Sequence, residues 1–370
     1  MARPPGHMAA LAGHTLGVLL TVIVACVWVA ASQLIEVIFQ DLSFDKPYFL
    51  TYFNTVGFTF WLLGGLCVPR WRAKLATPPP EPLLEVNAEP SRCGAWTYVF
   101  TALSVCPAWM LANYLFNVSL DMTSVASNSV LSSTSNIWTM LFSACFLQER
   151  VDPVKVLAVI VAVGGAALVS TSDAGDGHGS KMGDGAWAWA GDALALVSAC
   201  MYGVYSVMLK RLVPEGDNAL SMPLVFGFIG AAVLLGGWPV FVVLDSTGLE
   251  PFELPRPRVL AFLALNAAVG TNLSDVLWAR ALQLTSPLVA TLGLSLTIPI
   301  GMLSDVALRG KAFSALYVFG ALLILVGFVL GTTAEWMWRR LGRLSHRLAG
   351  GRGSLSSARS CRGLETAQGA

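Results

Sequence analysis

A stripe of hydroxyl and amide side chains lies inside an otherwise apolar segment of the chain. Its members recur at spacings of four and three residues and are Ser124, Asn128, Ser132, Ser135 and Thr139. On a helix of 3.6 residues per turn they share about a quarter of the circumference, and the apolar side chains lie elsewhere. Because hydrocarbon offers polar groups no partner, such a face normally turns toward a bundle interior or a water-filled path. The stripe therefore predicts a solute pathway, and polar cohesion between helices is the alternative.

The rest of the composition is that of an integral membrane protein. Of 370 residues, 55% are hydrophobic and only 12% are charged, against about a quarter charged in an ordinary soluble domain. Apolar blocks of roughly the 20 residues needed to cross hydrocarbon recur about ten times. They run over residues 16–39, 48–68, 96–118, 122–147, 154–170, 189–212, 220–244, 259–282, 287–308 and 313–336. The sequence thus predicts an all-α integral membrane protein of about ten transmembrane helices, the first being too long for a cleaved signal sequence.

The reactive side chains argue against several other classes of protein. The seven cysteines are odd in number and mostly lie within the spans, so they form neither a disulfide framework nor a metal spacing. All four histidines fall outside the spans, which excludes an intramembrane Ser–His pair or a zinc site on a helix. The net charge is only +1. We expect no cofactor, no metal and no nucleic-acid partner.

Basic residues alternate between successive loops. If the N-terminus is cytosolic, the cytosolic side holds the loop between Arg70 and Arg92, the pair Lys210 and Arg211, and the basic tail. The opposite side carries fewer Lys and Arg residues. The positive-inside rule therefore places both termini in the cytosol, which requires an even number of helices.

An internal repeat divides the chain. Sliding the second half back by 162 positions aligns identical residues, among them Ser286 with Ser124 and Gly327 with Gly165. This shift spans five helices, and an odd number per repeat makes the two halves cross the membrane in opposite directions, as in many secondary transporters. We expect a first five-helix repeat over residues 1–171, a flexible non-cytosolic loop over 172–188, a second repeat over 189–336 and a basic cytosolic tail over 337–370.

The second-half partner of the polar helix contains Thr297, Pro299 and Gly301. Pro299 should free a backbone carbonyl and bend that helix at membrane depth. Bends of this kind occur in solute sites and in transmembrane helices generally, so both interpretations stay open. The predicted substrate pathway joins the stripe to Thr297 and Pro299.

Acidic residues at helix depth are candidates for coupling or gating. Glu36 and Asp305 lie near the non-cytosolic ends of their helices, whereas Asp275 lies deeper. A carboxylate at membrane depth costs about 2.5 to 3.5 kcal/mol on insertion scales, so it is usually retained for a partner, a proton or a cation. A salt bridge from Asp275 to Arg280, or a hydrogen bond to a neighbouring helix, is the structural alternative. No Lys or Arg lies at the centre of a span, which favours a neutral or cationic solute over an anionic one.

Three motifs in order carry a family resemblance. They are Thr123-Ser-Val-Ala-Ser-Asn-Ser-Val-Leu-Ser-Ser-Thr-Ser, then Gly191-Asp-Ala-Leu-Ala-Leu leading to Tyr205 and Lys210-Arg211, then Leu292-Gly-Leu-Ser-Leu-Thr-Ile-Pro-Ile followed by Asp305. Together they resemble the F subfamily of solute carrier family 35, in the EamA-like drug/metabolite transporter superfamily. The resemblance implies about ten helices in a five-plus-five inverted repeat and a cavity walled partly by the fourth and ninth helices. It also implies an endomembrane location, vacuolar or lysosomal, and no particular substrate.

We therefore expect a multi-pass membrane transporter that moves a small organic metabolite by alternating access, with proton coupling as an open possibility. An intramembrane enzyme is disfavoured because Asp275 and Asp305 lie on opposite sides of the membrane and neither has a Gly-x-Gly-Asp context. A non-transporting membrane receptor or assembly subunit on the same fold is the alternative, because fold does not fix function. The expected partners are a small-molecule substrate and the lipid bilayer, and a homodimer is left open.

Overall fold

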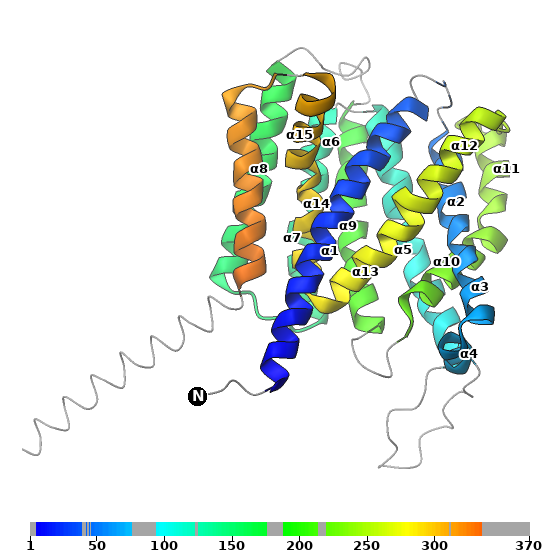
Figure 1. Ribbon diagram of the computed structural model, residues 1–370. Coiled ribbons are helices and arrows are strands. Elements are labelled where there is room, and N and C mark those ends of the chain that lie inside the picture. The colour runs from blue at the N-terminus through cyan, green and yellow to red at the C-terminus, as the bar shows by residue number, and fades with distance from the viewer. Residues whose placement is uncertain are drawn as a thin grey trace, which may run out of the picture.

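The structure, a computed structural model, describes residues 5–38, 46–75, 94–122, 125–175, 188–213, 220–310 and 312–334, together with Leu42 and Phe44. All regular secondary structure in these residues is helical (Figure 1). The helix α8 extends to Gly175 and so enters the predicted non-cytosolic loop. The rest of that loop up to residue 187, Ser124 of the stripe and the predicted basic tail all lie outside the described residues.

The helices run back and forth along the bundle. Their bounds are α1 Pro5–Glu36, α2 Pro47–Val56, η2 Gly57–Thr59, α3 Phe60–Cys67, α4 Pro69–Leu75, α5 Ala95–Met122, α6 Val125–Ser133, α7 Ser135–Phe146, α8 Pro153–Gly175, α9 Ala188–Leu212, α10 Met222–Gly236, α11 Trp238–Ser246, α12 Pro257–Leu265, η3 Asn266–Leu273, α13 Ser274–Leu284, α14 Pro287–Ser295 and α15 Thr297–Arg309. A last helix spans Ala315–Ala334. Several of them begin with proline, whose fixed φ suits the first turn and whose missing N–H is not needed there.

Seven of the described helices are long and apolar enough to cross a membrane. The pair α10 and α11, which is bent by 44°, brings the number to eight when it is counted as one span. The two remaining predicted spans, residues 48–68 and 122–147, are each divided into short helices. The described residues therefore form an all-α membrane protein with seven to eight candidate spans.

Helix boundaries recur at the shift that aligns the two halves of the sequence. A shift of 162 positions carries α5 onto the stretch from the start of α12 to the end of α13. It also carries the interruption at Thr134, between α6 and α7, onto the interruption at Leu296, between α14 and α15. In Figure 1, α6 lies above α7 whereas α15 lies above α14, so these interrupted segments run in opposite directions.

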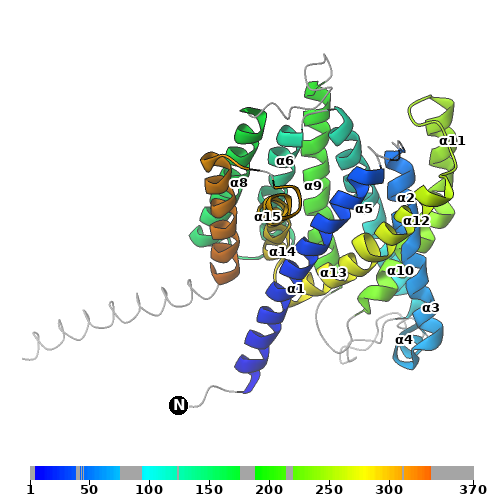
Figure 2. The same ribbon diagram turned by 45° about the horizontal axis from the view of Figure 1, so that its top comes forward.

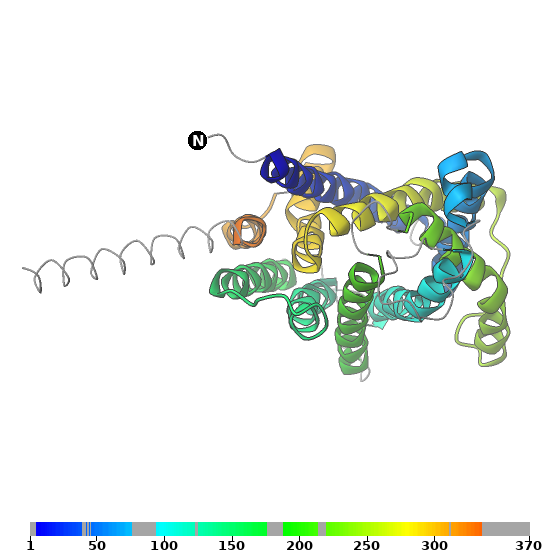
Figure 3. The same ribbon diagram turned by 90° about the horizontal axis from the view of Figure 1, so that it is seen from below.

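The helices form two layers when the bundle is viewed from below (Figure 3). The blue α1 lies beside the yellow α12 and α13, and the green α9 and cyan α5 lie on the other side. The closest packing follows the same division, because α1 packs along α13 and α5 packs along α9. Figure 2 shows α1 passing beside α13 and α14.

The outer surface of the bundle is apolar and its interior is partly polar. Large hydrophobic side chains such as Phe60 and Leu235 are exposed, which suits a surface that faces hydrocarbon. The largest buried cluster contains aromatic side chains, among them Trp109, Tyr205 and Trp278. Buried Asn, Ser, Thr and Asp side chains lie in the same interior. This distribution directs the search for a site to the inside of the bundle.

Close helix contact at one side of the bundle depends on glycine. A Cβ built on Gly165 of α8 would lie 2.6 Å from the carbonyl oxygen of Gly320 in the last helix. The reciprocal Cβ on Gly320 would lie 2.7 Å from the carbonyl oxygen of Gly165. Small residues that let helix backbones approach are typical of contacts between membrane helices.

Candidate substrate pathway

The first half of the polar stripe takes part in hydrogen bonds between helices. Asn128 of α6 is buried, and its Nδ2 donates to Ser119 Oγ of α5 at 2.9 Å. The Ser119 hydroxyl in turn donates to the carbonyl of Gly191 in α9 at 2.8 Å. Ser132 donates to Asn128 Oδ1 at 3.2 Å. This part of the stripe therefore joins α6 to α5 and α9.

The second half of the stripe lies on α7 and has unused hydrogen-bonding capacity. Ser135 and Thr139 are both buried, and Thr139 Oγ1 has no hydrogen-bond partner among the described residues. A buried hydroxyl without a partner is unusual in a folded protein and needs an explanation. This half of the stripe therefore keeps hydrogen-bonding capacity that a solute could use.

Asn136 belongs with the stripe but is absent from the predicted set. It is fully buried on α7, and its Nδ2 donates to Ser295 Oγ of α14 at 3.1 Å. Its Oδ1 has no hydrogen-bond partner in the described part of the chain. The spacing of four residues from Asn128 through Ser132 to Asn136 is the signal that could have identified it.

Thr297 and Pro299, the predicted pathway residues of the second half, lie on α15. The helix before it, α14, packs on α7 of the polar stripe. Thr297 Oγ1 donates back to the carbonyl of Leu294 at 2.7 Å. The helix is interrupted at Leu296, three residues ahead of Pro299. Proline has no N–H for the carbonyl four residues earlier, which is that of Ser295. Thus the bond between Asn136 and Ser295 lies where both interrupted helices meet.

The three predicted acidic residues do not form one site. Glu36 is the last residue of α1, and its side chain lies outside what the structure describes. Asp305 is partly buried on α15. Gln33 Nε2 donates to Ser304 Oγ at 2.8 Å, which brings the end of α1 against α15 and places Glu36 and Asp305 at the same end of the bundle. Asp275 is the second residue of α13, and Figure 1 shows the helix α13 below the end of the bundle where α1 meets α15.

Asp275 is buried, with 3% of its surface exposed. The ion pair with Arg280, one of its sequence-based alternatives, is not formed within the described ranges, where Arg280 Nη1 instead donates to Gln283 Oε1 at 3.0 Å. Nor does Asp275 Oδ2 have a hydrogen-bond partner among these residues. The neighbouring Ser274 hydroxyl accepts from Trp28 Nε1 of α1 at 3.0 Å. The π-helical η3 directly precedes this pair, and such segments are frequent at functional sites.

Four aromatic rings from α5, α9 and α13 gather in one cluster, and one of them, Trp278, follows Asp275 by one turn of α13. Tyr205 stacks on Trp278 with ring centroids 5.5 Å apart and an interplanar angle of 15°. Trp109 lies 5.0 Å from Tyr205, and Tyr202 lies 5.7 Å from Trp278, in both cases between centroids. Asp275 lies within electrostatic range of both Tyr202 and Tyr205. Sequence reasoning missed this group because no spacing along the chain connects its members.

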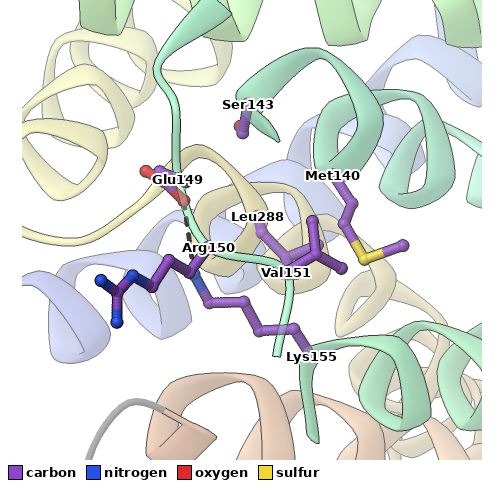
Figure 4. Close-up of a pocket in the computed structure, with 7 residues that line it drawn as sticks. All are labelled: Met140, Ser143, Glu149, Arg150, Val151, Lys155 and Leu288. Atoms are coloured by element: carbon purple, nitrogen blue, oxygen red, sulfur yellow. Dashed lines mark hydrogen bonds and ion pairs between the residues drawn. The ribbon is translucent and has the colours of Figure 1, made fainter. Parts of the chain in front are cut away.

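A small pocket at another place is lined by charged and apolar side chains (Figure 4). It lies where α7 ends and α8 begins, and its lining residues are Met140, Ser143, Glu149, Arg150, Val151, Lys155 and Leu288. Glu149 and Lys155 form an ion pair with a distance of 3.4 Å. None of the predicted site residues lines this pocket, so it adds nothing to the candidate pathway.

Comparison with known proteins gives consistent matches. The model of the family described as solute carrier family 35 (SLC35F) matches residues 91–333. An uncharacterized vacuolar membrane protein of Saccharomyces cerevisiae is 36% identical over 353 residues, covering 85% of this chain and 89% of that protein. A thiamine-repressible mitochondrial transport protein of the same yeast is 31% identical, over 86% of this chain and 91% of that protein. One crystal structure shares the fold at 17% identity with a TM-score of 0.63, over 89% of this chain and 98% of that one.

Proposed function

This chain belongs to the SLC35F family of solute carriers, and from that membership we propose that it moves a small organic solute by alternating access. It is a multi-pass membrane transporter, so its role is transport rather than enzymatic catalysis. The vacuolar relative supports an endomembrane location. Within the endomembranes we assign the protein to the vacuole or lysosome, with both termini in the cytosol.

The proposal includes ten spans in two inverted halves, residues 1–171 and 189–336. The segments α2 to α3 and α6 to α7 each reach the length of about 20 residues that crosses hydrocarbon once their short helices are joined. When α10 and α11 are also joined into one span, these segments bring the number of spans from seven to ten. The helix boundaries that recur at a fixed shift, and the opposite directions of α6–α7 and α14–α15, support the repeat.

One observation carries the proposed pathway: two interrupted helices meet through the buried bond between Asn136 and Ser295. Two polar atoms without a partner in the described part of the chain, Asn136 Oδ1 and Thr139 Oγ1, lie beside that bond. In inverted-repeat transporters, interrupted helices near the membrane midplane form the substrate site, because their freed backbone groups and polar side chains meet the solute. We therefore place the pathway between α7 and α14–α15, with Ser135, Thr297 and Pro299 in its walls.

The acidic residues divide into two roles in this scheme. Asp275, which is buried and has no basic partner among the residues that the structure describes, is the candidate to hold a proton or a cation during transport. Glu36 and Asp305 share the far end of the bundle and are candidates for gating there. This division follows from two contacts of α1: Gln33, near its end, bonds Ser304 of α15, whereas Trp28, more than one turn earlier, bonds Ser274 beside Asp275.

Metabolite profiling of isolated organelles, with and without the protein, tests the function without a prior choice of substrate. We expect at least one small organic solute to change its ratio between lumen and cytosol when the protein is removed. Re-expression of the wild-type chain should restore that ratio. Unchanged profiles for all detected solutes would contradict transport and favour a non-transporting receptor or assembly subunit.

A further inference from the structure

We infer that the substrate is an organic cation, held between the carboxylate of Asp275 and the rings of Trp109, Tyr202, Tyr205 and Trp278. This inference rests on the proposed transport function and narrows its substrate class. The five side chains are called the aromatic–acid cluster below. They come from α5, α9 and α13, and therefore from both proposed halves of the chain.

Three buried polar atoms of the aromatic–acid cluster lack a partner within the described residues. They are Asp275 Oδ2, Tyr205 Oη and Trp278 Nε1. A buried polar atom without a hydrogen bond is costly, and a buried carboxylate is costlier still. Native structures keep few such atoms, and each calls for a reason. Three in one place indicate that a ligand supplies the missing partners.

The charges around the aromatic–acid cluster select a cation. In the part of the chain that the structure describes, no Lys or Arg forms an ion pair with Asp275, and Arg280 is bonded to Gln283. An anionic ligand would meet the carboxylate without any compensating positive charge. A protonated amine or quaternary ammonium group would instead be attracted by the carboxylate and by the faces of the Trp and Tyr rings.

The packing of the helices provides a way into the aromatic–acid cluster. The four rings contact one another in this structure, with neighbouring centroids 5.0 to 5.8 Å apart. The helix α1 packs extensively along α13, as does α5 along α9, whereas α9 meets α13 mainly through side chains, in the ring contacts with Trp278 and the bonds of Lys210 at the end of α13. Separation of these two helix pairs would part Tyr205 from Trp278 and admit a ligand beside Asp275. The substrate thus enters as the pairs move apart, which is the motion that alternating access requires.

The test measures binding of organic cations to the full-length protein in nanodiscs of uncharged lipid. The probes are choline, benzyltrimethylammonium and tetraethylammonium, with the neutral carbon isostere of choline and with benzoate as controls. We expect at least one cation to raise the unfolding temperature in a saturable way, and the neutral and anionic controls to have no such effect. Absence of saturable binding for all three cations would overturn the inference.

Variants identify the residues that bind. Asp275→Asn keeps the shape of the side chain and should weaken the apparent affinity for the bound cation by about tenfold or more. Asp245→Asn is the matched control, because Asp245 is an exposed carboxylate on α11 and lies outside the aromatic–acid cluster. Trp278→Phe keeps a ring but loses the N–H and the stronger cation attraction of indole. It should weaken binding, and because the smaller ring leaves a void in a buried cluster, it should also lower the unfolding temperature of the ligand-free protein. Wild-type affinity in Asp275→Asn would overturn the inference.

The same variants separate the binding site from the transport function. Saturable binding that depends on Asp275, without solute flux in proteoliposomes, would support the site and contradict transport. Flux of a solute by the wild-type protein without binding of any cation would support transport and overturn the site. Both measurements use the same purified full-length chain.

Discussion

Lys210 of α9 holds the C-terminal end of α13. Its ammonium group donates to the carbonyls of Leu282, Gln283 and Thr285 at 2.8, 2.6 and 2.7 Å. The last carbonyls of a helix have no intrahelical N–H to bond, and positive charge is favoured beside them. We therefore predict that Lys210→Met, which keeps an unbranched side chain without its charge, destabilises the folded protein.

The expected loss for Lys210→Met is about 2 to 4 kcal/mol of unfolding free energy. A single hydrogen bond to a charged group contributes about 1.5 to 3 kcal/mol. The three bonds share one charge, so their contributions are less than additive. Lys210 is also only partly buried, and water that reaches the vacated carbonyls would offset part of the loss.

Denaturant titration of the purified protein in mixed micelles, followed by tryptophan fluorescence, measures this loss. Arg211→Met is the matched control, because Arg211 is the next residue along α9 and is exposed. Equal unfolding free energies for Lys210→Met and Arg211→Met would refute the argument. Because α9 carries Tyr205 and α13 carries Asp275, we also expect Lys210→Met to change the rate of solute flux.

Three further predictions concern helix contacts, the stripe and topology. Gly165→Ala should destabilise the protein by about 1 to 3 kcal/mol through overpacking, whereas Gly164→Ala, with open space around its Cβ, should be neutral or slightly stabilising, as thermal unfolding would show. Asn128→Leu should lower stability because it breaks buried hydrogen bonds, whereas Thr139→Val should fold normally and alter uptake; normal folding of Asn128→Leu would contradict this. An impermeant thiol reagent should label Cys93 and Cys361 from the cytosolic side only, and labelling from the other side would reject the ten-span topology.

Local signals in the sequence predicted the helical architecture. Apolar blocks of span length gave the all-α membrane class, and several predicted starts fall within two residues of the observed ones, as at Pro153, Pro257 and Pro287. Proline at the first turn and the apolar run behind it are both properties of neighbouring residues. The number of spans is harder to predict from the sequence, because the interruptions at Thr134 and Leu296 depend on how the helices pack.

The environment of Asp275 could not be derived from the sequence. Hydropathy placed Asp275 deep in its helix. A carboxylate at that depth predicts a bound partner, proton or cation. Tyr202 and Tyr205 lie near it on α9, far away in the chain, and no spacing rule connects residues on different helices. Lys210 shows the same limit, because its charge was read as a sign of membrane side while its role at the end of α13 depends on a contact between two helices.

The stripe from Asn128 to Thr139 illustrates why one periodic pattern can support two interpretations. Periodicity shows that polar side chains share a face, but it carries no information on what lies opposite that face. Opposite α6 lies Ser119, which takes up the hydrogen-bonding capacity of Asn128. Along α7, Thr139 stays unpaired in the described residues and Asn136 is paired at only one of its two polar atoms. A solute can form hydrogen bonds only where capacity is left, so the pathway we propose follows α7, and the α6 part of the stripe serves cohesion between helices.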